Sequence, residues 1–265
     1  MKEILQITSE DNTLVVKIEK GELISLVKNN LEYIHQKGAP GWRNSDTEMF
    51  PIIGPTASNN FVVETPKGNC IQDQHGLLRE LNYTVVNQTT ATVSYKKEYI
   101  TNTKIKNSKY PNKSPEPYVF WPYDFSFIKK YEIKNDTLVI SFSIESEINM
   151  PFMLGYHPAF LLSGNKKETI VSKNESISID TILKQGSIAY PVKNSDTICL
   201  EKEDGNIVKI KTTGFDNFML WTEVNNMICI EPITKYPYNN NKKLLPEMFT
   251  TSKGKAYFEV VINTK

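Results

Sequence analysis

The stretch DFSFIKKYEIKNDTLVISFSIES, residues 124–146, decides the fold, because apolar and polar residues alternate along it on both sides of a short polar break. Alternation with a period of two is typical of half-buried strands, so we predict two strands, 124–133 and 136–146, joined by a turn. The same pattern recurs at 13–19, 91–99, 207–213, 218–224, 227–233 and 256–262. Short strands separated by short turns predict an all-β fold, either an antiparallel sandwich or a barrel.

The rest of the chain fits one all-β domain. No stretch carries apolar residues at sustained helical spacing, so we expect helices to be short and peripheral, which excludes Rossmann and TIM-barrel folds. All-β domains commonly reach about 250 residues, and no linker divides the 265 residues, so we predict a single domain over 1–265. Residues 100–123 hold four prolines and several lysines. We interpret them as a long surface excursion between two strands, which is usually functional or disordered.

Composition excludes several classes of protein. The 31 basic and 30 acidic side chains give a net charge of +1, whereas nucleic-acid binding relies on clustered cations. The three cysteines lack metal-ligand spacing and do not suggest a disulfide scaffold. The N-terminus MKEILQITSEDNT has no apolar core of a secretory signal, and no run approaches the roughly 18 apolar residues of a membrane helix. We therefore predict a cytoplasmic protein that binds neither nucleic acid nor membrane.

Two histidines stand in unusual surroundings. His75 lies in QHGLLRE directly before Gly76, and His157 lies in PFMLGYHPAF between Tyr156 and Pro158. Rigidly held loops concentrate binding and catalytic groups, so both imidazoles are candidates for chemistry. The alternative for each is a hydrogen-bonded imidazole that serves only the structure.

Glu231 is the most informative acidic residue. It lies in MICIEPIT, whose apolar residues predict a buried strand, where an unpaired carboxylate costs several kcal/mol. One interpretation is a desolvated carboxylate with a raised pKa, suited to proton abstraction. The other is a strand-end carboxylate that points to solvent just before Pro232. Cys229 shares the face of Glu231 by the period of two, and we expect it to have a packing role.

Aromatic and guanidinium groups accompany these segments. Sugars stack their C–H faces on aromatic rings, which makes a carbohydrate pocket plausible, although such rings also simply fill cores. Arg43 and Arg79 are the only arginines, and each offers a planar bidentate donor that lysine cannot mimic. The aromatic residues in or beside the segments are Trp42, Trp121, Tyr123, Tyr156, Phe160 and Trp221.

Other enzyme signatures are absent from the sequence. It contains no GxSxG, GxxxxGK[ST], GxGxxG or HExxH motif. These absences argue against a hydrolase nucleophile elbow, a phosphate-binding loop of the nucleotide-binding folds and a zinc-binding metalloprotease helix. A glycosidase needs two positioned carboxylates, and Glu231 is the single convincing one. Hydrolysis is therefore disfavoured.

Six segments in order between residues 20 and 234 resemble the aldose 1-epimerase (galactose mutarotase) family, specifically its bacterial branch with a HGFAR-like motif. The resemblance implies a large antiparallel β-sandwich of the galactose mutarotase-like superfamily and an isomerase that interconverts the anomers of a free aldohexose. The segments are KGELISLVKNNLEYI (20–34), GWRNSDTEMFPIIG (41–54), HGLLRE (75–80), WPYDFSFIKKYEI (121–133), PFMLGYHPAF (151–160) and FMLWTEVNNMICIEPIT (218–234).

The resemblance also implies roles for single residues. Glu231 matches the general base that takes the proton of the C1 hydroxyl, His157 matches the general acid that protonates the ring oxygen, and His75 matches a histidine that binds substrate near that oxygen. The chemistry requires no cofactor and no metal. The other expected contacts to the sugar are Arg79, Arg43, Trp221 and Tyr156.

One departure from the family pattern leaves the substrate open. Pro55 follows FPIIG where the family commonly has arginine, so Arg43 or Arg79 would have to replace that contact, or the pocket accepts a different sugar. One alternative is a non-catalytic sugar-binding or sensor protein of the same fold. Another is a hexose-6-phosphate mutarotase, in which lysines of residues 104–113 would bind the phosphate. The oligomeric state stays open.

Overall fold

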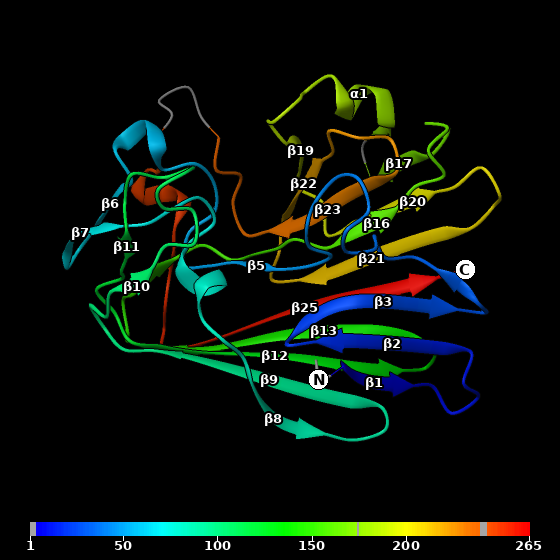
Figure 1. Ribbon diagram of the computed structural model, residues 1–265, viewed down its shortest axis with the longest axis horizontal. Coiled ribbons are helices and arrows are strands. Elements are labelled where there is room, and N and C mark those ends of the chain that lie inside the picture. The colour runs from blue at the N-terminus through cyan, green and yellow to red at the C-terminus, as the bar shows by residue number, and fades with distance from the viewer. Residues whose placement is uncertain (1–3, 174, 239–242) are drawn as a thin grey trace.

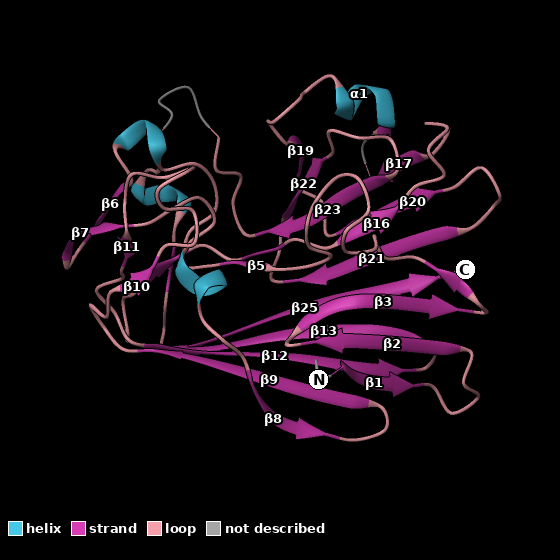
Figure 2. Ribbon diagram, viewed as in Figure 1, coloured by secondary structure: helices cyan, strands magenta, loops and turns pink. Residues whose placement is uncertain are grey.

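Antiparallel strands make up most of the computed structural model, which describes residues 4–173, 175–238 and 243–265 (Figure 1 and Figure 2). The largest sheet has nine strands in the order β18 (Ser176–Ser178), β17 (Thr169–Ser172), β20 (Thr197–Glu201), β21 (Ile207–Thr213), β25 (Lys255–Thr264), β13 (Thr137–Ser146), β12 (Phe125–Lys134), β9 (Thr92–Tyr99) and β8 (Thr84–Gln88).

A second sheet carries the functional segments. Its order is β19 (Tyr190–Lys193), β22 (Asn217–Trp221), β23 (Met227–Ile233), β15 (Gly155–Tyr156) and β5 (Glu48–Met49), and β16 (Ala159–Leu161) also pairs with β23. A third sheet joins β1 (Ile4–Thr8), β2 (Leu14–Glu19), β3 (Glu22–Lys28) and β4 (Leu31–Glu32). A bridge between Ile34 and Phe160 connects these two sheets.

The remaining elements are short. Three two-stranded antiparallel sheets pair β6 (Val62–Thr65) with β7 (Gly68–Ile71), β10 (Ile105–Lys106) with β11 (Tyr118–Val119), and β14 (Pro151–Phe152) with β24 (Thr250–Thr251). The helices are α1 (Ile179–Leu183) and the 3₁₀ turns η1 (Ala57–Asn59), η2 (Leu77–Glu80) and η3 (Pro246–Met248). None of the helices in the described ranges is long and apolar enough to cross a membrane.

The nine-stranded sheet packs against the second and third sheets, and an aromatic core lies at this packing. Strand β1 contacts β9 and β12, and Figure 1 shows β1–β3 lying across β12 and β13. Between the layers the ring of Phe142 lies 5.9 Å from that of Phe127 and 5.3 Å from that of Tyr156, and all three side chains are fully buried. The predicted all-β antiparallel sandwich is confirmed. That residues 1–265 form one domain stays a prediction.

The hairpin that the sequence predicted from residues 124–146 is present. Strands β12 and β13 pair in unbroken register from Phe125 opposite Ser146 to Lys134 opposite Thr137. Asn135 and Asp136 between them both have positive φ, as the tight turns that match the strand twist require.

Two predicted boundaries differ from the structure. The strand expected over 218–224 ends at Trp221, because the Thr222 hydroxyl donates to the Val224 carbonyl and accepts from its N–H, which closes a turn. Residues 100–123 are more than a surface excursion. They contain β10 and β11, and the side chain of Trp121 is fully buried.

Candidate active site

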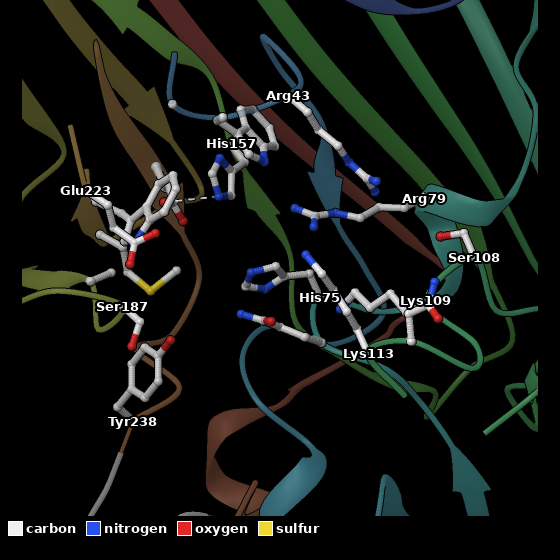
Figure 3. A pocket seen from close by; sticks show the side chains of 18 residues that line it. Arg43, His75, Arg79, Ser108, Lys109, Lys113, His157, Ser187, Glu223 and Tyr238 are labelled. Atoms are coloured by element: carbon white, nitrogen blue, oxygen red, sulfur yellow. Dashed lines mark ion pairs between the residues drawn. The ribbon is translucent and has the colours of Figure 1, made fainter. Parts of the chain in front are cut away.

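A cavity of about 620 Å³ opens at one end of the second sheet (Figure 3). Residues from distant parts of the sequence line it. Glu231 comes from β23, His157 lies between β15 and β16, and His75 and Arg79 come from the segment around η2. Its other lining residues are Gly41, Trp42, Arg43, Gln74, Ser108, Lys109, Asn112, Lys113, Ser187, Ala189, Met219, Trp221, Glu223 and Tyr238.

Glu231 is held in a fully buried strand. Every residue of β23 is buried, and the side chain of Glu231 is only 2% exposed. Strand β23 is flanked by β22 on one side and by β15 and β16 on the other, so its backbone is fixed from both edges. The prediction of a buried strand is confirmed, and the solvent-facing alternative for Glu231 is wrong.

His157 is fixed between two neighbouring segments. Its backbone N–H donates to the Thr47 carbonyl at 2.8 Å and its carbonyl accepts from the Thr47 N–H at 3.3 Å. The indole of Trp42 stacks on the imidazole, with ring centroids 4.3 Å apart and planes inclined by 27°. Trp42 is itself held by His35, whose Nε2 lies 2.7 Å from the Trp42 carbonyl oxygen. Packing and backbone bonds thus restrict the orientation of the His157 ring.

The two groups meet at the floor of the cavity. His157 Nε2 lies 3.3 Å from Glu231 Oε1 (Figure 3). Burial raises the pKa of the Glu231 carboxyl to about 8, although the positive charge of Arg79 opposes this shift. Burial also lowers the pKa of the His157 imidazole well below its usual range, and Arg79 adds to that effect. Near neutral pH the pair therefore holds one proton in total, a shared state that belongs to both groups.

His75 projects into the cavity from a constrained turn. Its φ is +72°, which is uncommon for a residue with a side chain. Its Nδ1 accepts a hydrogen bond from the Gly54 N–H at 3.3 Å. Burial lowers the pKa of His75 well below its usual range, so the ring is neutral and its hydrogen resides on Nε2. His75 therefore offers a hydrogen-bond donor to a ligand.

Gly76 is required for this turn. Its φ is +78° with ψ of 170°, a conformation that is essentially restricted to glycine. A Cβ atom there would lie 2.2 Å from the carbonyl oxygen of Phe50. The sequence interpretation that His75 projects from a tight backbone agrees with this geometry.

The two arginines both reach the cavity. Arg79 points toward the space between His157 and His75 (Figure 3), and its Nε donates to the Glu48 carbonyl at 3.2 Å. Its Nη2 is buried without a hydrogen-bond partner among the described residues. Arg43 is more exposed and also lines the cavity, whereas Pro55 is not among the lining residues.

Tyr156 does not line the cavity, which contradicts the expectation that it contacts substrate. Its side chain is fully buried, and its hydroxyl donates to Asp46 Oδ2 at 2.7 Å. The period of two explains the outcome, because consecutive residues point to opposite faces. His157 faces the cavity and Tyr156 faces the core, while Trp221 lines the cavity as predicted for a contact residue.

Asp46 belongs to a buried charge cluster beneath the site that sequence reasoning missed. Lys129 Nζ lies 2.8 Å from Asp46 Oδ2 and 2.6 Å from Glu48 Oε1, and its side chain is completely buried. Tyr131 donates to the same Asp46 oxygen at 2.9 Å. Burial raises the pKa of Asp46 to about 6, with Lys129 opposing the shift. The cluster fixes β5, which pairs with β15 next to His157.

Residues 105–119 contribute one rim of the cavity. Asp73 accepts hydrogen bonds from Asn107 at 2.9 Å and from Lys109 at 2.5 Å. This anchor places Lys109 and Lys113 at the cavity lining. The lysine-rich composition of 104–113 was the one sequence signal for these residues. Gln74, Met219 and Tyr238 also line the cavity and had no such signal.

Cys229 places a sulfur next to the reactive pair, although it does not itself line the cavity. Its Sγ, a nitrogen of His157 and an oxygen of Glu231 all lie within 4.8 Å of one another, and all three residues are buried. The sequence prediction that Cys229 shares the face of Glu231 is in keeping with this grouping. These are the donor types that bind transition metals.

Comparisons with known proteins agree with this architecture. Residues 21–223 match the family model described as aldose 1-epimerase. The plasmid form of the protein LacX of Lactococcus lactis subsp. lactis is 25% identical, and the match covers 86% of each chain. The family match includes His75, Arg79 and His157, and it ends before Glu231.

Solved structures show the same fold. A galactose mutarotase-like protein from Lactobacillus casei ATCC 334 superposes with a TM-score of 0.77 at 16% identity, over 99% of this chain and 100% of the other. A galactose mutarotase related enzyme from Lactobacillus acidophilus gives a TM-score of 0.74 at 18% identity, over 98% and 97% of the two chains.

Proposed function

This chain belongs to the aldose 1-epimerase family, and on that premise we propose that it is an isomerase that interconverts the α and β anomers of a free aldohexose. One observation carries the proposal. The Glu231 carboxyl and the His157 imidazole lie 3.3 Å apart at the floor of a cavity of about 620 Å³. An acid and a base at this spacing fit the two oxygen atoms of a cyclic hemiacetal.

The geometry supports simultaneous proton transfer at both oxygens. The C1 hydroxyl oxygen and the ring oxygen are bonded to the same carbon, so they lie closer together than two hydrogen-bonded atoms. Glu231 and His157 can therefore each approach one of them at about 2.6–3.2 Å, the reach that general catalysis requires. Neither the leaving ring oxygen nor the C1 oxygen then accumulates a full charge.

Ring opening transfers two protons and breaks one bond. The Glu231 carboxylate takes the proton of the C1 hydroxyl, whose O–H electrons form the carbonyl bond. The C1–O5 bond breaks, and O5 takes its electrons and the proton from His157. After rotation about the C1–C2 bond the hydroxyl attacks the other carbonyl face, and both proton transfers run in reverse. The cycle restores both groups, and it requires no metal or cofactor.

The protonation of the pair supports this scheme. The reaction needs one proton on the two groups, and the opposite pKa shifts of Glu231 and His157 leave one proton there near neutral pH. In the free protein the shifts favour the proton on Glu231. A bound hemiacetal offers its hydroxyl to Glu231 and its ring oxygen to His157, which favours the carboxylate and imidazolium form that opening consumes.

Other residues in the cavity have the chemistry to bind a sugar. The neutral ring of His75 offers an Nε2 donor, which suits a contact near the ring oxygen. Trp221 lines the cavity with an indole, on which the C–H face of a pyranose stacks. We assign Arg79 and Arg43 to hydroxyl contacts in place of the arginine that Pro55 replaces.

The experiment follows mutarotation directly. Freshly dissolved α-anomers of several aldoses are monitored by optical rotation and by anomeric proton NMR, with wild type and Glu231→Gln. We expect wild type to accelerate equilibration and Glu231→Gln to lose about 10²- to 10⁴-fold of that acceleration. Thermal unfolding of both proteins controls for folding. Full activity in Glu231→Gln would remove the base assignment, and sugar binding without acceleration would favour the non-catalytic sugar-binding alternative.

A second candidate substrate class, hexose 6-phosphates, is favoured by the charges around the cavity. Arg43, Arg79, Lys109 and Lys113 all line it. Lys109 is paired with Asp73, whereas neither Arg43 nor Lys113 forms an ion pair within the described part of the chain. Cations without a protein partner at a cavity rim suit a phosphate group.

Two variants, each of which removes the charge of one lysine, test whether the substrate is a hexose 6-phosphate. Lys113→Gln removes a rim cation, and Lys106→Gln removes an exposed lysine on β10 that does not line the cavity. If the substrate is phosphorylated, we expect Lys113→Gln to raise KM several-fold for the 6-phosphate and to leave KM for the free sugar unchanged. Lys106→Gln should change neither. Equal KM changes for both sugars in Lys113→Gln would contradict a phosphate contact.

A further inference from the structure

We propose that the floor of this cavity is also a binding site for a thiophilic divalent cation such as Zn²⁺, held by His157, Cys229 and Glu231. The donor atoms of the three residues all lie within 4.8 Å of one another, and each residue is buried. Two of them, His157 and Glu231, line the cavity from which an ion would enter. Cys229 lies behind them, next to Met227 and Ala159.

The strand pairing fixes this spacing. Cys229 and Glu231 are two residues apart on β23, so their side chains share one face. The segment that carries His157 runs beside β23, because Ala159 pairs with Cys229 and the Ile230 N–H donates to the Pro158 carbonyl at 3.2 Å. All three donor atoms therefore belong to two segments that are hydrogen-bonded to each other, β23 and the segment that carries His157. A metal would not need to assemble distant parts of the chain.

The distances are within reach of zinc coordination. Zinc binds sulfur at about 2.3 Å, imidazole nitrogen at about 2.0–2.1 Å and carboxylate oxygen at about 2.0–2.2 Å. At tetrahedral angles two donors on one ion thus lie about 3.3–3.7 Å apart. The three donor atoms lie within 4.8 Å of one another, so a pair at that limit has to approach by about 1 Å, which side-chain rotation can provide.

The set of donors selects the metal. One sulfur, one imidazole nitrogen and one carboxylate oxygen suit Zn²⁺ and other thiophilic ions, whereas Mg²⁺ and Ca²⁺ prefer all-oxygen sites. Three protein ligands leave the fourth tetrahedral position to water from the cavity. As the metal binds, two protons leave to solvent, one from the Cys229 thiol and the one that Glu231 and His157 hold between them. The thiolate and carboxylate then balance the two charges of the ion beside Arg79.

The inferred site has a consequence that rests on the proposed function. The metal would occupy the His157 lone pair and a Glu231 oxygen, which are the atoms that ring opening uses. Bound metal and mutarotation therefore exclude each other. The cation acts as an inhibitor of this enzyme, and Cys229 supplies the affinity without taking part in the proton transfers.

Metal binding is tested without any activity measurement. Metal-free protein is titrated with Co²⁺ or Cd²⁺, and the thiolate-to-metal charge-transfer absorption is recorded, followed by competition with Zn²⁺. We expect one equivalent to produce the band and Zn²⁺ to remove it. Cys229→Ala should lose the band, whereas Cys199→Ala, a matched change of a half-buried cysteine on β20, should keep it. Absence of a band in wild type, or a band that persists in Cys229→Ala, would overturn the site.

Thermal unfolding of both variants checks that they are folded, and His157→Gln provides a second ligand deletion should Cys229→Ala unfold.

A measurement of activity then distinguishes the metal site from the proposed function. The ratio of mutarotation rates with and without Zn²⁺ should fall well below one in wild type and return toward one in Cys229→Ala. A charge-transfer band in a protein that accelerates no sugar refutes the proposed function and leaves the metal site intact. Mutarotation without a band refutes the site alone.

Discussion

Glu231 and His157 at the floor of the cavity hold one proton between them near neutral pH. The number of protons on this pair sets the expected pH dependence of the activity. Below the lower pKa of the pair both Glu231 and His157 are protonated, so no base is available. Above the upper pKa both have lost their protons, so no acid is available. Activity requires the state between, and the two limits belong to the pair rather than to either residue.

We therefore expect a bell-shaped profile of kcat/KM. The alkaline limb should fall through about pH 8, because burial raises the pKa of Glu231 to about 8. The acid limb should lie below the usual range of histidine, because burial lowers the pKa of His157. Mutarotation rates at low substrate concentration across this range provide the measurement. A profile that rises steadily to pH 10 would contradict a shared proton.

Arg79 offers a way to move these limits. Its positive charge lowers the pKa of both Glu231 and His157, so Arg79→Met should shift both limbs of the profile toward higher pH. Arg79→Lys keeps the charge and should leave the limbs close to those of wild type. The shift distinguishes an electrostatic role from lost binding, since lost binding alone lowers kcat/KM at every pH. Unmoved limbs in Arg79→Met would exclude the electrostatic role.

The turn at His75 and Gly76 shows how one element positions a side chain that we propose to bind the sugar. Gly76→Ala would place a Cβ 2.2 Å from the Phe50 carbonyl oxygen and force a residue with a side chain into a glycine conformation. Such strain costs about 1–3 kcal/mol, and the displaced turn should also weaken sugar binding. Gly205→Ala is the control, because its φ is also positive and nothing lies within 4 Å of the added carbon.

Urea denaturation and KM for the best sugar measure the two effects. We expect Gly76→Ala to lose stability and to raise KM, and Gly205→Ala to lose stability by a smaller amount with KM unchanged. Equal behaviour of the two variants would mean that the close approach to Phe50 has no influence on the site.

The strands that a sequence could predict are those with one face in the core. The alternation over 124–146 predicted β12 and β13 because inward apolar and outward polar residues have a period of two. The short strands β5, β15 and β16 position His157, yet strands of two or three residues give too little pattern to identify. The same alternation places Lys129 on the inward face of β12 between Phe127 and Tyr131. This was the available signal for the buried charge cluster.

On the scale of the whole molecule, the candidate site depends on contacts between residues far apart in sequence. His75, His157 and Glu231 were identifiable because each stands in a local sequence context that is unusual for its type. The distance between His157 and Glu231 comes from the pairing of β15 and β16 with β23, and His75 is held by hydrogen bonds from Phe50 and Gly54. No local pattern encodes these contacts. The family resemblance, which is confirmed, was the reason to expect that these separate segments contribute to one site. The roles of the individual residues remain predictions.

The buried cluster beneath the site should contribute strongly to stability. Lys129→Met would leave Asp46 and Glu48 as buried carboxylates without their shared cation, and removal of one partner from a buried pair costs about 3–5 kcal/mol. Lys130→Met is the matched control, because Lys130 is partly exposed and pairs with Glu132 at 3.0 Å. Such surface pairs contribute less than about 1 kcal/mol.

Equilibrium urea unfolding of the two variants measures the difference. Lys129→Met should also lower mutarotase activity, since the cluster fixes β5 beside His157. A loss of less than 1 kcal/mol in Lys129→Met would show that the two carboxylates are accommodated as neutral acids at little cost.

Residues 105–119 are tied to the rest of the molecule at the cavity by hydrogen bonds from Asn107 and Lys109 to Asp73 and from Ser108 to Glu80. The reactive pair lies on β23 and beside it. On the proposed function, this rim segment and the reactive pair of His157 and Glu231 belong to separate stretches of the chain. Substitutions in the rim would then change the choice of sugar while the reactive pair stays unaltered. Replacing residues 105–119 with the corresponding segment of a relative is therefore a way to exchange substrate preference.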